Sequence, residues 1–90
     1  MTSYAIDMRG DSMRERYRPG ETLYVNPELP VRPGYEYVFR NSDKPLIQVR
    51  HLVEITDEHW LVRQWNPLTE YKILRAEWPA AERIIGSYTP

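Results

Sequence analysis

The sequence predicts a single, mainly β domain built from short antiparallel strands. Three observations carry this prediction. Residues 4–9 alternate apolar and polar side chains, the period of two that is typical of a half-buried strand. Eight prolines and four glycines divide the 90 residues into short segments, and seven tyrosines and three tryptophans favour strands. The hydrophobic content of 41% supports one modest core, and the length leaves no room for a second, so residues 1–90 are expected to form one domain.

A short helix is expected directly after the first strand. Gly10 and Asp11 form a turn, and the run from Ser12 to Glu15 fits a capping box, in which a hydroxyl and a carboxylate satisfy free amides at a helix start. The helix should continue to about Tyr17. Residues 18–20, Arg-Pro-Gly, should end it, because proline cannot continue a helix.

The remaining elements are read as strands and turns. Prolines stiffen the connection over residues 26–34, because each removes a donor that a strand ladder would need. The turn-rich residues 41–45 predict that the strands on either side pair antiparallel. Residues 77–81 are read as irregular chain or one helical turn. The expected strands are residues 21–25, 35–40, 46–55, 59–65, 71–74 and 83–87.

Composition excludes several function classes. The formal net charge of -1 provides no global field to attract nucleic acid or a lipid surface. The absence of cysteine excludes disulfides, thiol nucleophiles and thiolate zinc sites, and two histidines cannot make a histidine-rich metal cluster. No apolar run is long enough to span a membrane, and the first residues lack the features of a signal peptide. We therefore expect a cytoplasmic protein without metal, cofactor or membrane partner.

The run Gly10-Asp11-Ser12-Met13 carries the first chemical signal. A serine after a glycine-containing turn, at the start of a helix, is exposed while nearby amides face a developing oxyanion. Ser12 is therefore a candidate nucleophile. The alternative is that Ser12 only caps the expected helix through its pairing with Glu15.

This run resembles the nucleophile motif of the LexA-like serine peptidases, the C-terminal domains of LexA and of phage repressors. The resemblance implies a LexA/signal-peptidase-like fold and extends over roughly residues 4–67, with residues 84–86 matching the closing strand. Further motifs follow in the family's order, at residues 18–25, 32–34, 37–39, 49–53 and 66–67.

In this family the serine attacks a peptide bond of its own chain, and an unprotonated lysine acts as general base. The resemblance places Ser12 at the nucleophile position, with Gly10, Asp11 and Met13 as the turn that supplies oxyanion contacts, and it places Arg50 at the lysine position. Arginine ionises above a pKa of about 12.5, so neutralising a guanidinium near pH 7 would cost on the order of 8 kcal/mol. Arginine therefore cannot serve as the base.

Three other residues are candidate bases. Lys44 lies in an expected turn and Lys72 in the C-terminal part of the chain, and neither falls at the family's lysine position. Histidine has a suitable reference pKa of about 6.5, but strand alternation places His51 on the face opposite Arg50 unless a bulge intervenes. Arg50 is expected to lie near Ser12, where its guanidinium can hydrogen-bond the hydroxyl or a bound carboxylate. The alternative is a surface cation paired across the strands.

The leading hypothesis is a regulatory and dimerisation module of a LexA-like transcriptional regulator, with self-cleavage lost or weak. The resemblance implies a homodimer formed through late strands, in which Trp65 or residues 83–87 contact the second subunit. It also implies recognition by a RecA filament. DNA would be bound only through an N-terminal domain absent from this chain, and the family's scissile bond lies further upstream than the chain extends. The alternatives are an active self-cleaving peptidase that uses a different base, a fragment related to signal peptidases, and a binding domain in which Ser12 is only a cap.

Overall fold

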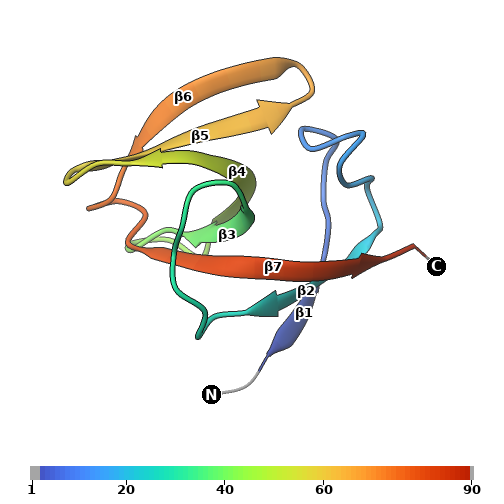
Figure 1. Ribbon diagram of the computed structural model, residues 1–90. Helices are drawn as coiled ribbons and strands as arrows, with labels where there is room; N and C mark the ends of the chain where they lie inside the picture. The colour runs from blue at the N-terminus through green and yellow to red at the C-terminus, as the bar shows by residue number, and fades with distance from the viewer. Residues whose placement is uncertain (1–2, 90) are drawn as a thin grey trace.

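The computed structural model describes residues 3–89, so the ends of the expected 1–90 domain, residues 1–2 and 90, lie outside the described residues. The chain forms one antiparallel sheet with the strand order β1-β2-β7-β3-β4-β5-β6 (Figure 1). The strands are β1 (Tyr4–Asp7), β2 (Thr22–Asn26), β3 (Glu36–Arg40), β4 (Ile47–Ile55), β5 (His59–Trp65), β6 (Leu68–Leu74) and β7 (Ala80–Tyr88).

The C-terminal strand β7 joins the two halves of the sheet. It pairs with β2 on one side and with β3 on the other, whereas β4, β5 and β6 follow β3 in chain order as a meander. In Figure 1 the β5–β6 hairpin folds over β4, while β1 and β2 lie on the other side of β7. The sheet is strongly curved, so the loop between β1 and β2 lies near the end of β5.

Curvature gives the sheet a hydrophobic cluster on each face. Neighbouring residues of β3 point to opposite faces, as strand geometry requires, and Val38 joins one cluster while Tyr37 and Phe39 join the other. Both faces of β3 are therefore buried. The first cluster, called the Met13 cluster, contains Met8, Met13, Tyr17, Leu23, Val25, Val38, Val49 and Ile84. The second, the Phe39 cluster, contains Tyr37, Phe39, Leu52, Trp60, Val62 and Ile73.

The predicted mainly β architecture and its strand positions are confirmed. The strands predicted at residues 35–40 and 46–55 pair antiparallel, with Val38 opposite Val49. The two strands nearest the C-terminus are longer than predicted, because β6 begins at Leu68 and β7 at Ala80. The helical turn considered for residues 77–81 does not form, since its last two residues already belong to β7.

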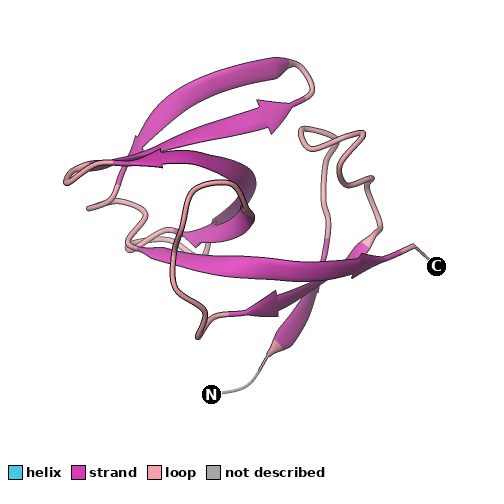
Figure 2. Cartoon of the chain, in the orientation of Figure 1, coloured by secondary structure: helices cyan, strands magenta, loops and turns pink. Residues whose placement is uncertain are grey.

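The short helix predicted after the Gly-Asp-Ser-Met run was wrong. Residues 11–16 form turns, with Arg14 N donating to Asp11 O at 3.0 Å and Tyr17 N donating to Met13 O at 2.7 Å. Glu15 has a φ of 81°, in the left-handed region, so a helix cannot continue through it. Figure 2 shows strands and loops only over the described chain. Accordingly, no helix within residues 3–89 has the length and apolar character needed to cross a bilayer.

Candidate functional site

The segment carrying Ser12 is a loop closed at its base by backbone hydrogen bonds. Met8 N donates to Glu21 O at 2.8 Å, and Gly20 N donates to Met8 O at 2.9 Å, so the chain leaves and rejoins the sheet at one place. Inside the loop, Met13 is completely buried in the Met13 cluster. Burial of this side chain anchors the loop and holds the preceding residue, Ser12, at the sheet.

Ser12 lies where β5 separates from β4. The last β4–β5 pair toward this end is His51 with Arg63. Beyond it, the backbone amides of Trp65 and Asn66 both donate to Ser12 O, at 2.8 and 2.9 Å. The Ser12 backbone therefore accepts the amides at the end of β5, which no longer pair with β4.

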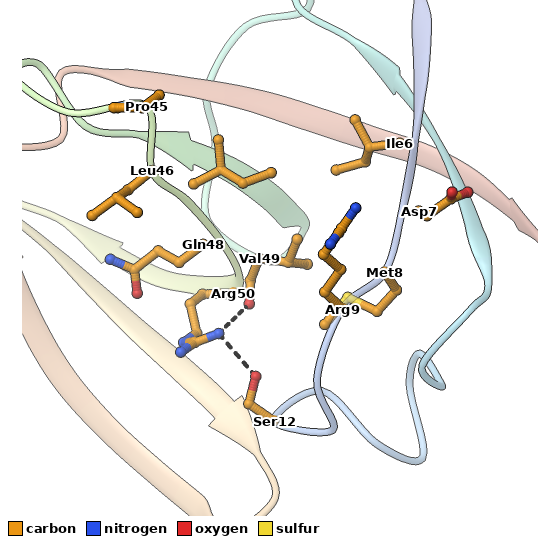
Figure 3. A pocket seen from close by; sticks show the side chains of 11 residues that line it. Ile6, Asp7, Met8, Arg9, Ser12, Pro45, Leu46, Gln48, Val49 and Arg50 are labelled. Carbon is orange, nitrogen blue, oxygen red and sulfur yellow. Dashed lines mark hydrogen bonds between the residues drawn. The ribbon is translucent and has the colours of Figure 1, made fainter.

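Arg50 connects Ser12 to two strands, β4 and β6. Its Nη1 donates to Ser12 Oγ at 3.1 Å and to Val49 O at 2.7 Å, as Figure 3 shows. Its Nε donates to the Tyr71 hydroxyl at 2.7 Å, and that hydroxyl donates to Gln48 Oε1 at 3.0 Å. We call these five residues the Arg50 network.

The polarity of the Ser12–Arg50 hydrogen bond is opposite to that of a nucleophile and its base. A general base accepts the hydroxyl proton, whereas a guanidinium carries only donors and does not give up its proton in proteins. Within residues 3–89, Arg50 is the hydrogen-bond partner of Ser12 Oγ. The arrangement holds the hydroxyl oxygen as an acceptor and provides no route for its proton.

Structure separates His51 from Ser12. His51 Nδ1 lies 2.7 Å from Glu36 Oε2, and its ring lies against Trp65 with centroids 5.5 Å apart. Arg16 Nη2 donates to the other oxygen of the same carboxylate at 3.2 Å. Burial, with a smaller contribution from the Glu36 charge, raises the pKa of Tyr17 to about 12. We call these residues, Arg16, Tyr17, Glu36 and His51, the Glu36 cluster.

The two lysines considered as bases do not reach Ser12. Lys72 follows Tyr71 on β6, and because Tyr71 points toward Arg50, strand alternation directs Lys72 to the opposite face. Lys44 lies in the turn before β4, where its backbone amide donates to Asn41 Oδ1. Among the described residues, no group of three or more His, Asp or Glu side chains is arranged to hold a metal ion.

The turn expected to supply oxyanion contacts has mixed roles. Gly10 adopts a φ of 73°, which a residue without a side chain tolerates best, and so provides the turn into the Ser12 loop. The Asp11 carbonyl accepts hydrogen bonds from Arg14 N and from Asn66 Nδ2. The Met13 side chain is a core residue. The oxyanion role of these three residues stays a prediction.

Sequence reasoning missed Tyr71 as a partner of Arg50, and Gln48 as the acceptor of the Tyr71 hydroxyl. Tyr71 is separated from Arg50 by 21 positions and lies on a strand that the sequence defined poorly. Gln48 lies two residues before Arg50, so strand alternation alone places the two side chains on one face. That signal was available for Gln48, and no comparable local signal existed for Tyr71.

Similarity to known proteins agrees with the fold. The Peptidase S24-like family model matches residues 2–88. Repressor protein C of Rhizobium phage 16-3 is 33% identical over 95 residues, which cover 96% of this chain and 36% of that protein. The prophage repressor CohE of Escherichia coli strain K12 is 29% identical over 77 residues, which cover 86% of this chain and 30% of that protein. The chain thus spans about a third of the length of these relatives, and it belongs to the Peptidase S24-like family.

Proposed function

We propose that residues 1–90 form the regulatory and dimerisation domain of a phage-repressor-like transcriptional regulator in which self-cleavage is absent or weak. In this proposal the regulator is a cytoplasmic homodimer, and a separate N-terminal part of it binds DNA. The family match and the two phage repressors among its relatives support the regulator class.

One observation carries the loss of cleavage: Arg50 Nη1 donates to Ser12 Oγ at 3.1 Å. A serine nucleophile needs a neighbour that accepts its proton as it attacks. Removing the base from other serine enzymes still leaves roughly a thousandfold acceleration over water, so a slow residual reaction is compatible with the proposal. Because Arg50 cannot accept the proton of Ser12, rapid cleavage is not expected.

Exposed apolar side chains on the outer surface of β2 and β7 support a dimer. Tyr24 lies opposite Gly86 in the β2–β7 ladder, and Ile85 and Tyr88 are each more than half exposed. These residues overlap the predicted interface at residues 83–87. Large exposed apolar and aromatic side chains that adjoin one another are typical of protein interfaces. Trp65, the other predicted contact, is half-buried against the Met13 cluster.

The test of the lost cleavage is covalent labelling of Ser12 by a serine-directed fluorophosphonate, read by mass spectrometry between pH 7 and 10. The wild-type chain should remain unlabelled. Arg50→Lys should gain labelling at Ser12, because a desolvated lysine can lose its proton near neutral pH. Arg63→Lys, the same substitution on the neighbouring strand β5, should remain unlabelled.

Two outcomes would contradict the proposal. Fast labelling of wild-type Ser12 would show an active nucleophile and favour a peptidase that uses a different base. Absence of labelling in a folded Arg50→Lys variant would show that position 50 does not control Ser12. In a parallel test, the whole regulator is incubated with RecA filament or at alkaline pH, and its chain should remain uncleaved.

A further inference from the structure

A second pocket lies where β7 separates from β3. The last pair of the β3–β7 ladder is Tyr37 with Arg83, whereas β7 continues beyond it along β2 (Figure 1). Residues on both sides of this gap, 35–36 and 83–87, help to line a pocket of about 410 Å³, within the range of roughly 300–1,000 Å³ that suits small ligands. It shares no lining residue with the pocket of about 640 Å³ beside the Arg50 network.

The charges that line this second pocket do not balance. Its charged residues are Arg16, Glu36 and Arg83, so two guanidiniums face one carboxylate. Both oxygens of the Glu36 carboxylate already have partners, because Arg16 Nη2 donates to one at 3.2 Å and His51 Nδ1 lies 2.7 Å from the other. The positive charge of Arg83 is therefore left without a carboxylate at the pocket.

Arg83 is half-buried, and its hydrogen-bond acceptors within residues 3–89 are neutral. Its Nε donates to the Tyr37 hydroxyl at 3.3 Å and its Nη2 donates to the Pro30 carbonyl, while its guanidinium carbon lies 4.1 Å from the centroid of the Tyr35 ring. No carboxylate of the described residues lies within salt-bridge distance of Arg83, and its Nη1 has no acceptor among them. Because a partly desolvated charge without a counter-charge is unfavourable, the pocket favours an anion from outside the chain.

The other walls of the second pocket are mainly apolar or aromatic. Tyr17 and Ile84 line it as buried members of the Met13 cluster, and Leu29, Tyr35 and Ile85 line it nearer the surface. An aspartate or glutamate side chain carries only one or two methylene groups, too few to cover these walls. Since each methylene group buried strengthens binding about fourfold, the pocket suits an anion with a longer hydrocarbon part.

We propose that the second pocket binds a small amphipathic carboxylate, with its charge on Arg83 and its hydrocarbon part against the apolar walls. Arg83 Nη1 donates a charge-assisted hydrogen bond to the carboxylate, and the contacts of Nε and Nη2 hold the guanidinium in place for it. Arg16 offsets the charge of Glu36, so that this carboxylate does not repel the ligand. The Arg50 network takes no part, so binding here goes beyond the proposed function and is independent of cleavage.

The test compares hexanoate with hexanamide, which has the same hydrocarbon chain without the charge, and with acetate, which has the charge on a single methyl group. Titrations of the wild-type chain, followed by backbone amide NMR, give the dissociation constants. Hexanoate should bind at least about tenfold more tightly than either compound and should shift the amides of residues 83–87. Equal binding of hexanoate and hexanamide, or of hexanoate and acetate, would overturn the proposal. Shifts confined to the amides beside Arg50 would place the anion in the other pocket and would also overturn it.

Variants identify the cation that holds the carboxylate. Arg83→Gln should remove the preference for hexanoate over hexanamide, and Arg83→Lys, which keeps the positive charge, should retain most of it. Arg75→Gln is the matched control, because Arg75 is also half-buried, lies 4.4 Å from the centroid of an aromatic ring and donates to a backbone carbonyl, yet does not line the pocket. This control should bind hexanoate as the wild type does. Loss of the preference in Arg75→Gln, or its retention in a folded Arg83→Gln, would contradict the site, and the wild-type titration tests it without any variant.

A second subunit is the competing source of a carboxylate, because residues 83–87 also belong to the predicted dimer interface. Repeating the hexanoate titration at protein concentrations below and above the dimer dissociation constant separates the two sources. The same affinity at both concentrations is expected for a small ligand. Loss of binding in the dimer would show that the second subunit fills the pocket and would overturn the choice of a small ligand. Neither result changes the labelling of Ser12, so failure of this site would leave the proposed function standing.

Discussion

Arg50 and His51 are neighbours on β4 whose side chains serve opposite faces of the sheet. His51 contacts the buried Glu36, which also accepts from Arg16, so the basic groups on that face share a carboxylate within the chain. Arg50 on the other face has only neutral hydrogen-bond partners within residues 3–89. The two faces of β4 therefore differ in charge: the basic groups on one face contact a carboxylate, and the guanidinium on the other contacts neutral groups.

Sheet register explains the difference. Glu36 lies directly opposite His51 in the β3–β4 ladder, which places the two side chains on one face within contact distance. Arg50 lies opposite Tyr37, an aromatic residue of the Phe39 cluster. The Arg50 side chain instead reaches the end of the sheet where β5 separates, and contacts Ser12 there. Strand pairing therefore places a carboxylate beside His51, whereas it places no carboxylate opposite Arg50.

The largest expected effect is on the face of β4 that carries His51. Glu36→Ala removes the hydrogen bonds of its buried carboxylate to Arg16 and His51, and the loss of two bonds to a charged group should lower the free energy of unfolding by about 3 kcal/mol. Urea denaturation of wild type and variant measures this free energy. Glu70→Ala, which breaks the exposed pair with Arg63, should cost about 1 kcal/mol or less. Equal losses in the two variants would show that the Glu36 cluster is no better compensated than a surface pair.

The second effect concerns alkaline pH. The pKa of Tyr17 is raised to about 12 in the folded chain, above its ordinary value of 10.0, so the unfolded state loses its proton first as pH rises. Stability should be intact below pH 10 and fall by about 2 kcal/mol toward pH 12. Tyr4, whose pKa is also raised to about 12, contributes to the same loss.

Urea denaturation at pH 9 and pH 11.5 separates these contributions. Tyr17→Phe should reduce the alkaline loss, and Tyr88→Phe, on an exposed side chain, should leave it unchanged. An identical pH dependence in wild type and Tyr17→Phe would mean that folding does not raise the pKa of Tyr17.

The smallest expected effect is on the face of β4 that carries Arg50. Tyr71→Phe removes the acceptor of Arg50 Nε and the donor to Gln48, and should cost about 1 kcal/mol of stability. The Arg50 Nε–H should also exchange faster with solvent, which NMR measures. Tyr88→Phe should change neither quantity. Slow exchange retained in Tyr71→Phe would indicate that Tyr71 does not position the guanidinium.

Most strands were predictable because their signals are local. Alternation at residues 4–9 and the turn at residues 41–45 depend only on neighbouring residues, and both predictions hold. The helix prediction at Ser12 failed because a capping pattern describes only local hydrogen bonds. Met13 and Tyr17 instead pack into the Met13 cluster, and the loop turns at Glu15 with a positive φ. Burial of these two side chains outweighs the local preference.

The proximity of Ser12 to Arg50 was predicted from the family resemblance, and the structure brings the two together. The separation of His51 from Arg50 was predicted from strand alternation and is also confirmed. Tyr71 was not predicted, because its contact with Arg50 depends on how far the β5–β6 hairpin curves over β4. That curvature arises from packing of the whole sheet.

The sequence by itself indicated the candidate residues of the site: Ser12 and, through the family resemblance, Arg50. It also placed Arg50 on the face opposite His51, which follows from the two-residue period of a strand, a local property. Only the tertiary structure decided that β5 leaves β4 at Ser12, that Tyr71 holds the guanidinium, and that the edge of β4 is open. These features depend on contacts between strands far apart in the chain, which no local pattern encodes.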